Sequence, residues 1–211
     1  MQSFRPRVLA ILPGFIPSTM ITVIQPLLDL DREGFLQSRI TLESLANKGD
    51  IHWADLVIFS RNVSPKYQPL MDAILSKGIP FVYDLDDNLF DIPYDTLLGQ
   101  YHRAEQQQAM MIRYIQHASL MRVYSEVMRQ RCLPLNPNTV RVVTPIDWRQ
   151  IRHPVAKSSP DKIKVVYATS RVDDQLFQVF MPAVERILNH YPGRVEFFMW
   201  GSFPSYYRKL P

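Results

Sequence analysis

Short apolar runs recur along the first 145 residues, and segments with helical character separate most of them. Runs of this length, bounded by turn residues such as Pro13 and Gly14, are typical of strands that are buried on both faces. Strands that alternate with helices predict an α/β fold, a Rossmann-like parallel sheet with helices on both faces. The expected strands are residues 7–13, 35–42, 54–60, 79–85, 119–125 and 139–145. The first expected helix begins after a cap at Ser18 or Thr19 and ends near residue 30. The other expected helices are residues 64–78, 96–117 and 125–133.

The composition changes near residue 147. Residues 147–162 are polar, rich in proline and serine and without a clear period, which is typical of a linker. Beyond them, expected strands at 163–170 and 194–201 enclose an expected helix at 172–193. We therefore expect a first domain over residues 1–146 and the opening strand–helix–strand unit of a second Rossmann-like domain over 163–211. One such unit cannot bury its own faces, so we expect that this second domain is incomplete in the chain.

Four aspartates, Asp84, Asp86, Asp87 and Asp91, lie within eight positions at the carboxyl end of the expected strand at 79–85. Ligands of parallel α/β sheets bind at the carboxyl ends of the strands, where these side chains and Gly14 are expected to lie. The alternative is a purely structural role, in which Asp84, Asp87, Asp91 and Asn88 cap the turn that follows the strand.

A strand followed by DLDDNLFD resembles the first motif of haloacid-dehalogenase-type phosphatases. In that interpretation Asp84 is the nucleophile and Asp86 the general acid, with magnesium as the metal. Three features oppose it. The motif usually lies on the first strand of the domain, Asn88 stands where threonine is usual, and little chain remains for the later lysine and acidic pair.

The spelling Asp84-Leu85-Asp86 also resembles the Asp-x-Asp motif of metal-dependent GT-A sugar transferases, in which it holds a divalent ion on the nucleotide diphosphate. That motif is short, and the two-domain layout with a linker fits it poorly.

Most of the chain resembles the metal-independent GT-B glycosyltransferases of the large group 1 class, which have two Rossmann-like domains. RVLAILPGFIPSTMITVIQPLLDL is similar to the opening of the acceptor domain, and KGIPFVYDLDDNLFDIP to a bacterial subfamily in which a strand ends in D-x-D-D-N. IKVVYATSRVDDQLFQVFMPAVERILNHYPGRVEFFMWG is similar to the opening of the donor domain. The resemblance implies transfer of a sugar from a nucleotide-sugar to a glycan or lipid-linked acceptor. The expected location is the cytoplasm, with peripheral contact at the inner face of the membrane as an alternative.

The resemblance also implies site residues. Asp86 stands where many relatives have a histidine that contacts sugar or acceptor, so it is the expected catalytic residue, as a base or a hydrogen-bonding group. The expected acceptor-binding residues are Gly14, Phe15, Asp84, Asp87 and Asn88. The expected donor-binding residues are Ser170, Arg171 and Gly201.

No metal and no cofactor apart from the nucleotide-sugar substrate is expected. The main donor-binding arginine, lysine and paired glutamates of the family have no counterpart in these 211 residues, so we expect little transferase activity from this chain alone. The remaining alternative is a Rossmann-like binding or scaffold module without catalysis.

Charge is unevenly distributed. The net charge is +4, yet residues 101–153 carry eight arginines, no lysine and three acids. This run is typical of a solvated helical face, and the alternative is peripheral contact with an anionic membrane or a phosphorylated ligand. Nucleic acid is not an expected partner, because no Lys/Arg block and no known binding motif is present.

The single cysteine, Cys132, excludes a disulfide framework.

Overall fold

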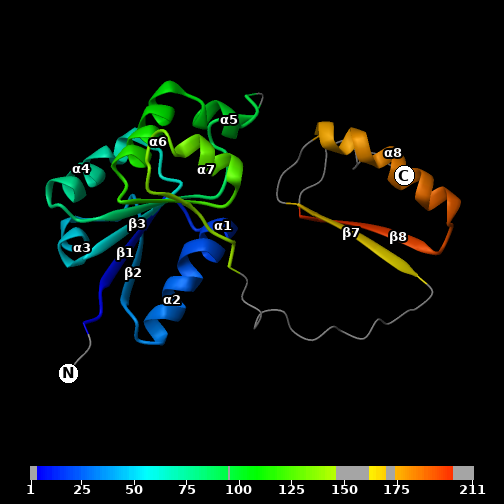
Figure 1. Cartoon of the computed structure of the whole chain (residues 1–211). Helices are drawn as coiled ribbons and strands as arrows, with labels where there is room; N and C mark the ends of the chain where they lie inside the picture. Colours follow the sequence, from blue (N-terminus) through cyan, green and yellow to red (C-terminus); the bar gives the residue numbers. More distant parts are fainter. Residues whose placement is uncertain (1–3, 95, 146–161, 170–173, 202–211) are drawn as a thin grey trace. The chain divides into compact units, whose positions relative to one another are not determined.

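The computed structural model describes residues 4–94, 96–145, 162–169 and 174–201. The chain forms two compact units, Met1–Trp148 and Arg149–Pro211 (Figure 1). Within the described residues, the first unit contains a six-stranded sheet and the second a two-stranded sheet. Residues 147–161 of the expected linker lie outside this part of the chain.

The sheet of the first unit is parallel throughout, with the strand order β2-β1-β3-β4-β5-β6. This arrangement confirms the predicted α/β fold. One strand lies beyond β1 on one side and four lie on the other, so the strand order reverses between β1 and β3. Its strands are β1 (Arg7–Leu12), β2 (Gln37–Leu42), β3 (Leu56–Ser60), β4 (Phe81–Leu85), β5 (Leu120–Val123) and β6 (Thr139–Arg141).

Helices cover both faces of this sheet, because alternate residues of its central strands point to opposite sides. Val8, Ala10 and Leu12 of β1 belong to one apolar cluster, which η1 (Met20–Ile24) and α2 (Gln25–Arg32) cover. Leu9 and Ile11 belong to the other, larger cluster on the opposite face (Figure 1). The helices that contribute to that cluster are α3 (Lys48–Trp53), α4 (Gln68–Ser76), α6 (Glu105–His117) and α7 (Glu126–Cys132).

The first helix begins earlier than the sequence predicted. Pro17 takes the first position of α1 (Pro17–Thr19), where its fixed φ and missing N–H are tolerated, and Ile16 is the residue before it. The expected cap at Ser18 or Thr19 is therefore wrong. Thr19 instead lies in the first turn, where its hydroxyl accepts from the Ile16 N–H at 3.2 Å. α1 continues directly into the π-helical η1 and then into α2.

The expected long helix at 96–117 is two helices, α5 (Leu97–His102) and α6. Ala104 between them has an extended backbone (φ −63°, ψ 142°), and the side chain of Gln108 donates to the free carbonyl of His102 at 2.7 Å. α3 was not predicted from the sequence, although Asn47 and Asp50 form a reciprocal capping box at its start. A short 3₁₀ turn, η2 (Pro65–Tyr67), precedes α4.

The second unit consists of β7 (Ile163–Thr169), α8 (Asp174–His190) and β8 (Val195–Gly201). The two strands pair in parallel, from Ile163 with Val195 to Thr169 with Gly201. Tyr167 packs against Phe177 and Phe180 with ring centroids 5.4 and 4.9 Å apart, which holds α8 on one face of the two strands. The predicted strand–helix–strand pattern is confirmed for these residues.

Candidate functional site

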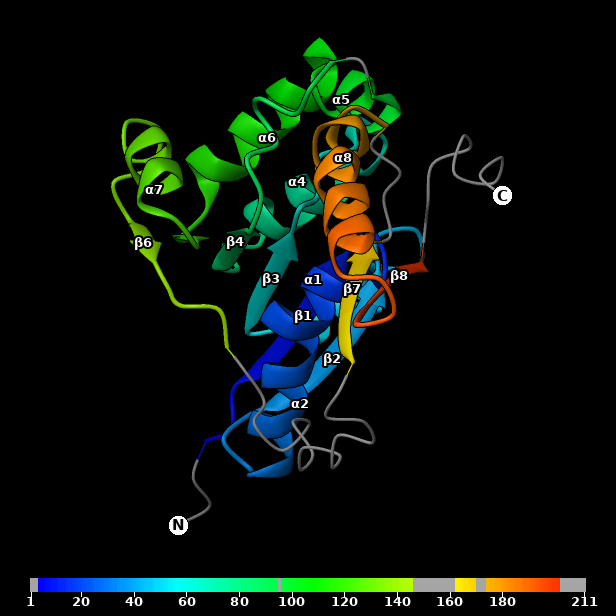
Figure 2. The same ribbon diagram turned by 90° about the vertical axis from the view of Figure 1, so that its right-hand side faces the viewer.

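Polar side chains from three neighbouring segments meet at the carboxyl end of the first unit's sheet. Ser18 follows β1, Arg61 follows β3, and Asp86 and Asp87 follow β4. The β3 arrow points toward the end of the sheet at which α5 lies (Figure 2). This is also where the strand order reverses, the usual place of a ligand crevice in open α/β sheets.

Arg61 joins these segments. Its Nη1 donates to Asp86 Oδ2 at 3.2 Å and to Ser18 Oγ at 3.3 Å, and its Nη2 donates to Asp87 Oδ2 at 2.9 Å. Only 8% of the arginine side chain is exposed. A buried guanidinium therefore connects the loop after β1 with the loop after β4.

The backbone of Arg61 is unusual. Its φ is +61°, and it is the one non-glycine residue with a positive φ in the described part of the chain. Its N–H donates to the Asp84 carbonyl at 3.0 Å, which keeps the residue attached to the end of β4. Such a conformation costs about 1–3 kcal/mol and persists where surrounding contacts enforce it, often at functional sites.

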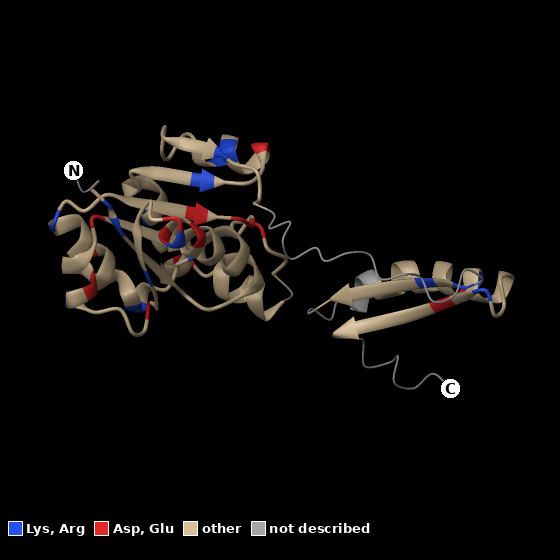
Figure 3. Cartoon of the chain, turned by 90° about the horizontal axis from the view of Figure 1, so that it is seen from below, with Lys and Arg blue, Asp and Glu red and all other residues tan. Residues whose placement is uncertain are grey.

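Asp84 is a fully buried centre of hydrogen bonds. Its Oδ1 accepts from Arg122 Nε at 2.6 Å and from the Tyr124 hydroxyl at 2.8 Å. Its Oδ2 accepts from Ser60 Oγ at 3.1 Å and from Thr22 Oγ1 at 3.2 Å. Burial and the nearby charge of Asp84 raise the pKa of Tyr124, so the phenol stays protonated and donates. The acidic end of β4 and the basic position beside it on β5 are visible in Figure 3.

This environment limits what Asp84 can do. A phosphatase nucleophile must reach phosphorus, and a metal ligand must direct a lone pair at the ion. Both oxygens of Asp84 are already occupied by two donors each, and the side chain is not exposed. The geometry therefore opposes the phosphatase and Asp-x-Asp interpretations, and it equally opposes the direct acceptor contact that we expected for Asp84. In the described residues no three His, Cys, Asp or Glu side chains gather as a metal site.

Asp86 and Asp87 differ from Asp84 in their access to solvent. Asp87 is half exposed and accepts from Arg61. Asp86 is 14% exposed; its Oδ2 accepts from Arg61, while its Oδ1 is buried without a hydrogen-bond partner. Asp86 therefore has one oxygen that Arg61 engages and one buried oxygen without a partner.

Asn88 and Asp91 act in the turn. Asn88 Oδ1 accepts from the Phe90 N–H at 3.2 Å, and its Nδ2 donates to Asp91 Oδ2 at 3.0 Å. Asp91 also pairs with Arg131. These contacts give Asn88 the turn-capping role that was the alternative to acceptor binding.

Gly14 and Phe15 lie just beyond β1. The Gly14 carbonyl accepts from Thr19 Oγ1 at 3.2 Å, and an added Cβ would meet only Ile16, at 4.0 Å. Local packing therefore does not explain why this position is glycine. Phe15 is exposed and contributes an apolar surface at the same sheet end.

Of the three expected donor-binding residues, the structure describes only Gly201. Ser170 and Arg171 lie outside the described residues. Gly201 ends β8 with a φ of +97°, and a Cβ there would lie 2.2 Å from the Thr169 carbonyl oxygen. Glycine is required at this position by backbone conformation and close approach, whatever else it does.

Two further polar groups near this end of the sheet, Glu43 and Asn62, were not predicted from the sequence. Buried Asn62 donates to Glu43 Oε2 at 2.7 Å, and its carbonyl accepts from the Tyr83 hydroxyl at 2.9 Å. Burial raises the pKa of Glu43, and the bond from Asn62 opposes that shift. Glu43 directly follows β2, and Asn62 lies two positions beyond the end of β3. Since parallel strands end at the same edge, this placement was the signal that could have found them.

His102, at the end of α5, is nine-tenths buried. Its Nδ1 has no hydrogen-bond partner. Burial lowers the pKa of His102 and the charge of Arg61 lowers it further, whereas Asp87 opposes the shift. The imidazole is therefore held neutral near the ion pairs of Arg61.

Most of the described arginines of residues 101–141 are paired. Of the six that the structure describes, four form ion pairs, and Arg103 lies 5.4 Å from the ring centroid of Tyr94. Arg149 and Arg152 lie outside the described residues. The pairs are Arg113–Asp72, Arg122–Asp84, Arg129–Glu126 and Arg131–Asp91. A continuous unpaired basic patch is not visible here, and none of the described helices is long and apolar enough to cross a membrane.

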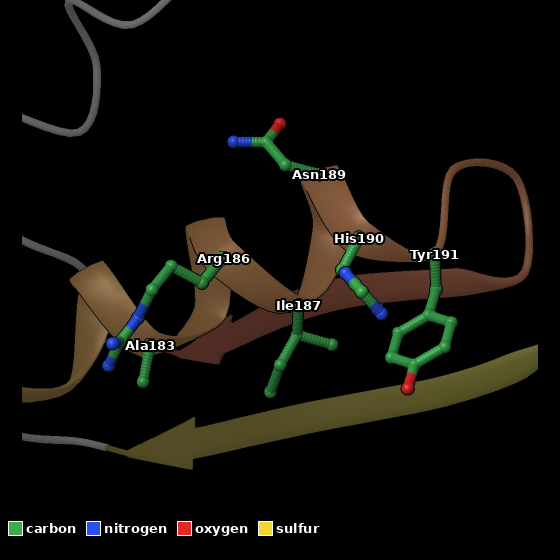
Figure 4. A pocket seen from close by; sticks show the side chains of 6 residues that line it. All are labelled: Ala183, Arg186, Ile187, Asn189, His190 and Tyr191. Carbon is green, nitrogen blue, oxygen red and sulfur yellow. The ribbon is translucent and has the colours of Figure 1, made fainter.

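A shallow hollow lies along α8 in the second unit (Figure 4). Its lining comes from one helix and the residue after it, and it lacks carboxylates. We therefore place the candidate site at the sheet end of the first unit. The hollow is lined by Ala183, Arg186, Ile187, Asn189, His190 and Tyr191.

Comparison with known proteins supports the fold. No family profile matches the sequence, and no curated protein is significantly similar to it. A solved structure that is similar is HepE from Anabaena, crystallised in complex with UDP and glucose. The match has a TM-score of 0.51 and 13% identity, and it covers 94% of this chain and 70% of HepE. The chain thus shares an α/β fold with a protein that binds UDP and glucose.

Proposed function

We propose that this chain belongs to a glycosyltransferase that moves a sugar from a nucleotide-sugar to a hydroxyl of a glycan or lipid-linked acceptor without a metal ion. The observation that carries the proposal is the cluster of Arg61, Asp86 and Asp87 at the point where the strand order reverses. The fold shared with HepE, which was solved with UDP and glucose, supports it.

In this proposal Asp86 is the group that acts on the acceptor. Its carboxylate is 14% exposed and is held through Oδ2 by Arg61, and it would accept a proton or a hydrogen bond from an attacking hydroxyl. Asp87, Gly14 and Phe15 border the acceptor. Asp84 supports the loop from beneath, and Asn88 shapes its turn. Ser170, Arg171 and Gly201 remain the proposed donor-side residues.

Binding is tested first, by the melting temperature of the chain with UDP, UDP-glucose and magnesium. A ligand that binds the native state raises this temperature. At a free ligand concentration of a hundred times Kd, the free energy of unfolding increases by about 2.7 kcal/mol. We expect little or no shift with UDP or UDP-glucose, in keeping with the weak activity expected of these 211 residues; a clear shift that does not require magnesium would instead show a working donor site. The absence of a shift with every nucleotide tested would contradict donor binding by this chain.

Turnover is tested by release of UDP from UDP-glucose, with and without simple glycoside acceptors. Asp86→Asn removes the proposed base and should lower the rate by roughly 10²–10⁴-fold. Asp91→Asn, at an exposed carboxylate of the same loop, is the matched control and should leave the rate unchanged. Equal rates in the Asp86→Asn variant and the unmodified chain would exclude Asp86 as the base. Magnesium-dependent release of phosphate from p-nitrophenyl phosphate would instead support the phosphatase.

We further propose a cytoplasmic location with peripheral contact to anionic membrane through residues 101–153. This contact should appear as binding to phosphatidylserine vesicles that weakens as salt is raised from about 0.05 to 0.5 M, since surface charges are screened over about one Debye length. Vesicle binding that is absent even at low salt would refute it.

A further inference from the structure

Glu43 lies at the same sheet end as the candidate site. It directly follows β2, and its N–H donates to the carbonyl of Leu12, the last residue of β1, at 2.8 Å. Gly14 and Phe15 follow the same end of β1, so Glu43 borders the loop that the proposed function places beside the acceptor. Within the described residues, no lysine or arginine forms an ion pair with Glu43. Its place in the fold therefore does not depend on a salt bridge.

One oxygen of the Glu43 carboxyl group is held, and the other is accessible. Oε2 accepts from Asn62 Nδ2 at 2.7 Å. Asn62 is fully buried, and its Oδ1 accepts from the Ser60 N–H at 2.9 Å, so this donor is fixed in place. Glu43 is only partly buried. Oε1 has no hydrogen-bond partner in the described residues, and the two buried side-chain atoms that lack a partner there belong to other residues. Solvent therefore reaches Oε1.

The electrostatic state of Glu43 also sets it apart. Burial raises its pKa, and the hydrogen bond from Asn62 opposes that shift. Each other carboxyl group with a shifted pKa in the described part of the chain has a lowered one, because hydrogen bonds or cations favour its ionised form. Those groups are Asp31, Asp55, Asp91, Glu126 and Glu196.

A purely structural role does not require an acid at this position. The bond between Glu43 and Asn62 joins the loops after β2 and β3, and glutamine would accept the same bond without a charge. Glutamate instead carries the cost of partial burial without a compensating cation. A carboxyl group perturbed by burial at the ligand-binding edge of a sheet indicates a role with a ligand.

We infer that Glu43 binds a hydroxyl group of the acceptor sugar through Oε1, while Asn62 holds Oε2. The inference rests on the proposed function, because it adds a binding residue to the acceptor side. β1 and β3 lie between β2 and β4, and adjacent strands are about 4.8 Å apart, so the axes of β2 and β4 are about 14 Å apart. Glu43, after β2, and Asp86, after β4, would therefore contact different parts of the acceptor.

An uncharged hydroxyl group fits Oε1. A carboxyl oxygen accepts from a hydroxyl when it is ionised, and a protonated carboxyl group can also donate to one. A phosphate group would add negative charge where no cation compensates it. A divalent cation needs several oxygen ligands, and within the described ranges no three His, Cys, Asp or Glu side chains gather. The exposed ring of Phe15, from the loop after β1, adds an apolar surface for the C–H groups of a sugar.

The first test is the melting temperature of the Glu43→Gln variant. Because the folded pKa of Glu43 is raised, its ionised form is disfavoured by the fold above the ordinary value of 4.5, and no penalty remains below that value. Glu43→Gln should therefore melt above the native chain at pH 7, and this advantage should vanish near pH 4. Glu33→Gln, at an exposed position after α2, is the matched control and should change neither value. A clear loss of stability in Glu43→Gln at pH 7 would show a structural link and overturn the inference.

The second test is NMR of the full chain labelled with ¹³C at the glutamate carboxyl carbons. The Glu43→Gln variant assigns the Glu43 signal. Methyl glucoside, methyl galactoside and N-acetylglucosamine are titrated to roughly 100 mM, which detects dissociation constants in the millimolar range. We expect the Glu43 signal to move with at least one sugar, while the signals of the exposed Glu33 and Glu105 do not. Inorganic phosphate and methylammonium are titrated in parallel and should leave the Glu43 signal unchanged.

A third variant tests the contact from the sugar side. Glu43→Ala removes both oxygens and should weaken sugar binding, measured by saturation-transfer NMR, by roughly threefold or more, as expected for the loss of one hydrogen bond. Glu33→Ala is the matched control and should leave sugar binding unchanged. Circular dichroism establishes that each variant is folded, and Glu43→Gln, which keeps the bond to Asn62, replaces Glu43→Ala if the latter is not.

The outcomes separate this inference from the proposed function. A Glu43 signal that no sugar moves, or that moves only with phosphate or methylammonium, would overturn the inference, whatever nucleotides do to the melting temperature. Sugar binding that Glu43→Ala leaves intact would also overturn it. If sugars move the Glu43 signal but no release of UDP is found, the inference stands and the transferase proposal fails in favour of a sugar-binding module.

Discussion

Replacement of Asp84 by alanine should destabilise the first unit strongly, although Asp84 is not expected to touch a ligand. The change removes a fully buried carboxylate that accepts four hydrogen bonds, including one from the Arg122 guanidinium at 2.6 Å. Arg122 would lose its counter-charge, and the Ser60 and Tyr124 hydroxyls would lose their acceptor. Breaking a buried ion pair from one side costs about 3–5 kcal/mol.

The lower part of that range applies here. The Arg122 side chain is 23% exposed, so its charge can still reach water after the change. We therefore expect a loss of about 3 kcal/mol, which corresponds to a fall of roughly 6–12 °C in the melting temperature of a domain of this size. Urea unfolding followed by circular dichroism measures the free energy of unfolding directly.

Two further variants make the result specific. Asp91→Ala, in an exposed ion pair with Arg131, should change stability too little to resolve. Arg122→Met combined with Asp84→Ala should recover part of the loss, because the unpaired charge is gone. If Asp84→Ala costs less than about 1 kcal/mol, or if the double variant is no better than the single one, the assignment of Asp84 as a buried structural centre is wrong.

Three other outcomes follow from local geometry. Burial raises the pKa of Cys132 to about 11, so its thiol should react with a disulfide reagent at pH 8 only after unfolding; rapid reaction of the native chain would contradict this. The hydrogen bond and charge of Arg7 lower the pKa of Asp55 from 3.8 to about 2. The stabilisation from ionised Asp55 should therefore be complete above pH 3.8 and vanish as pH falls through 2, so that Asp55→Asn is less stable than the native chain at pH 7 but equally stable near pH 2. Gly99→Ala would place a Cβ 1.8 Å from the Pro93 carbonyl oxygen and should cost about 1–3 kcal/mol in urea unfolding; a neutral result would show that this corner adapts freely.

Local patterns predicted the helices and strands well, because the periodicity of apolar residues in each element depends on residues that are close in sequence. The six strands of the first sheet and the strand–helix–strand of the second unit all appear near their expected positions. The misses have local causes that the periodicity does not carry. Pro17 moved the start of the first helix, the extended Ala104 divided α5 from α6, and the capping box of Asn47 and Asp50 made a helix too short for a period to show.

The position of the candidate site in the fold could be predicted from the sequence, but the residues that form it could not. The rule that ligands bind at strand carboxyl ends pointed to the aspartate run, yet it treated Asp84 and Asp86 as equivalent. The structure separates them: Asp84 is enclosed by donors from β3, β5, the segment after β5 and η1, whereas Asp86 retains a free oxygen. Arg61, which bonds the other oxygen of Asp86, lies 25 positions away from it along the chain.

The sequence by itself determined that this chain forms parallel α/β units with a carboxylate cluster at one strand end, since apolar periodicity and the position of Asp84–Asp91 after an apolar run are properties of consecutive residues. Only the tertiary structure decided which carboxylates are occupied and which are available. Hydrogen-bond partners at a sheet edge come from strands that are adjacent in space but distant in sequence, and the strand order that brings Ser18, Arg61 and Asp86 together is set by packing of the whole sheet.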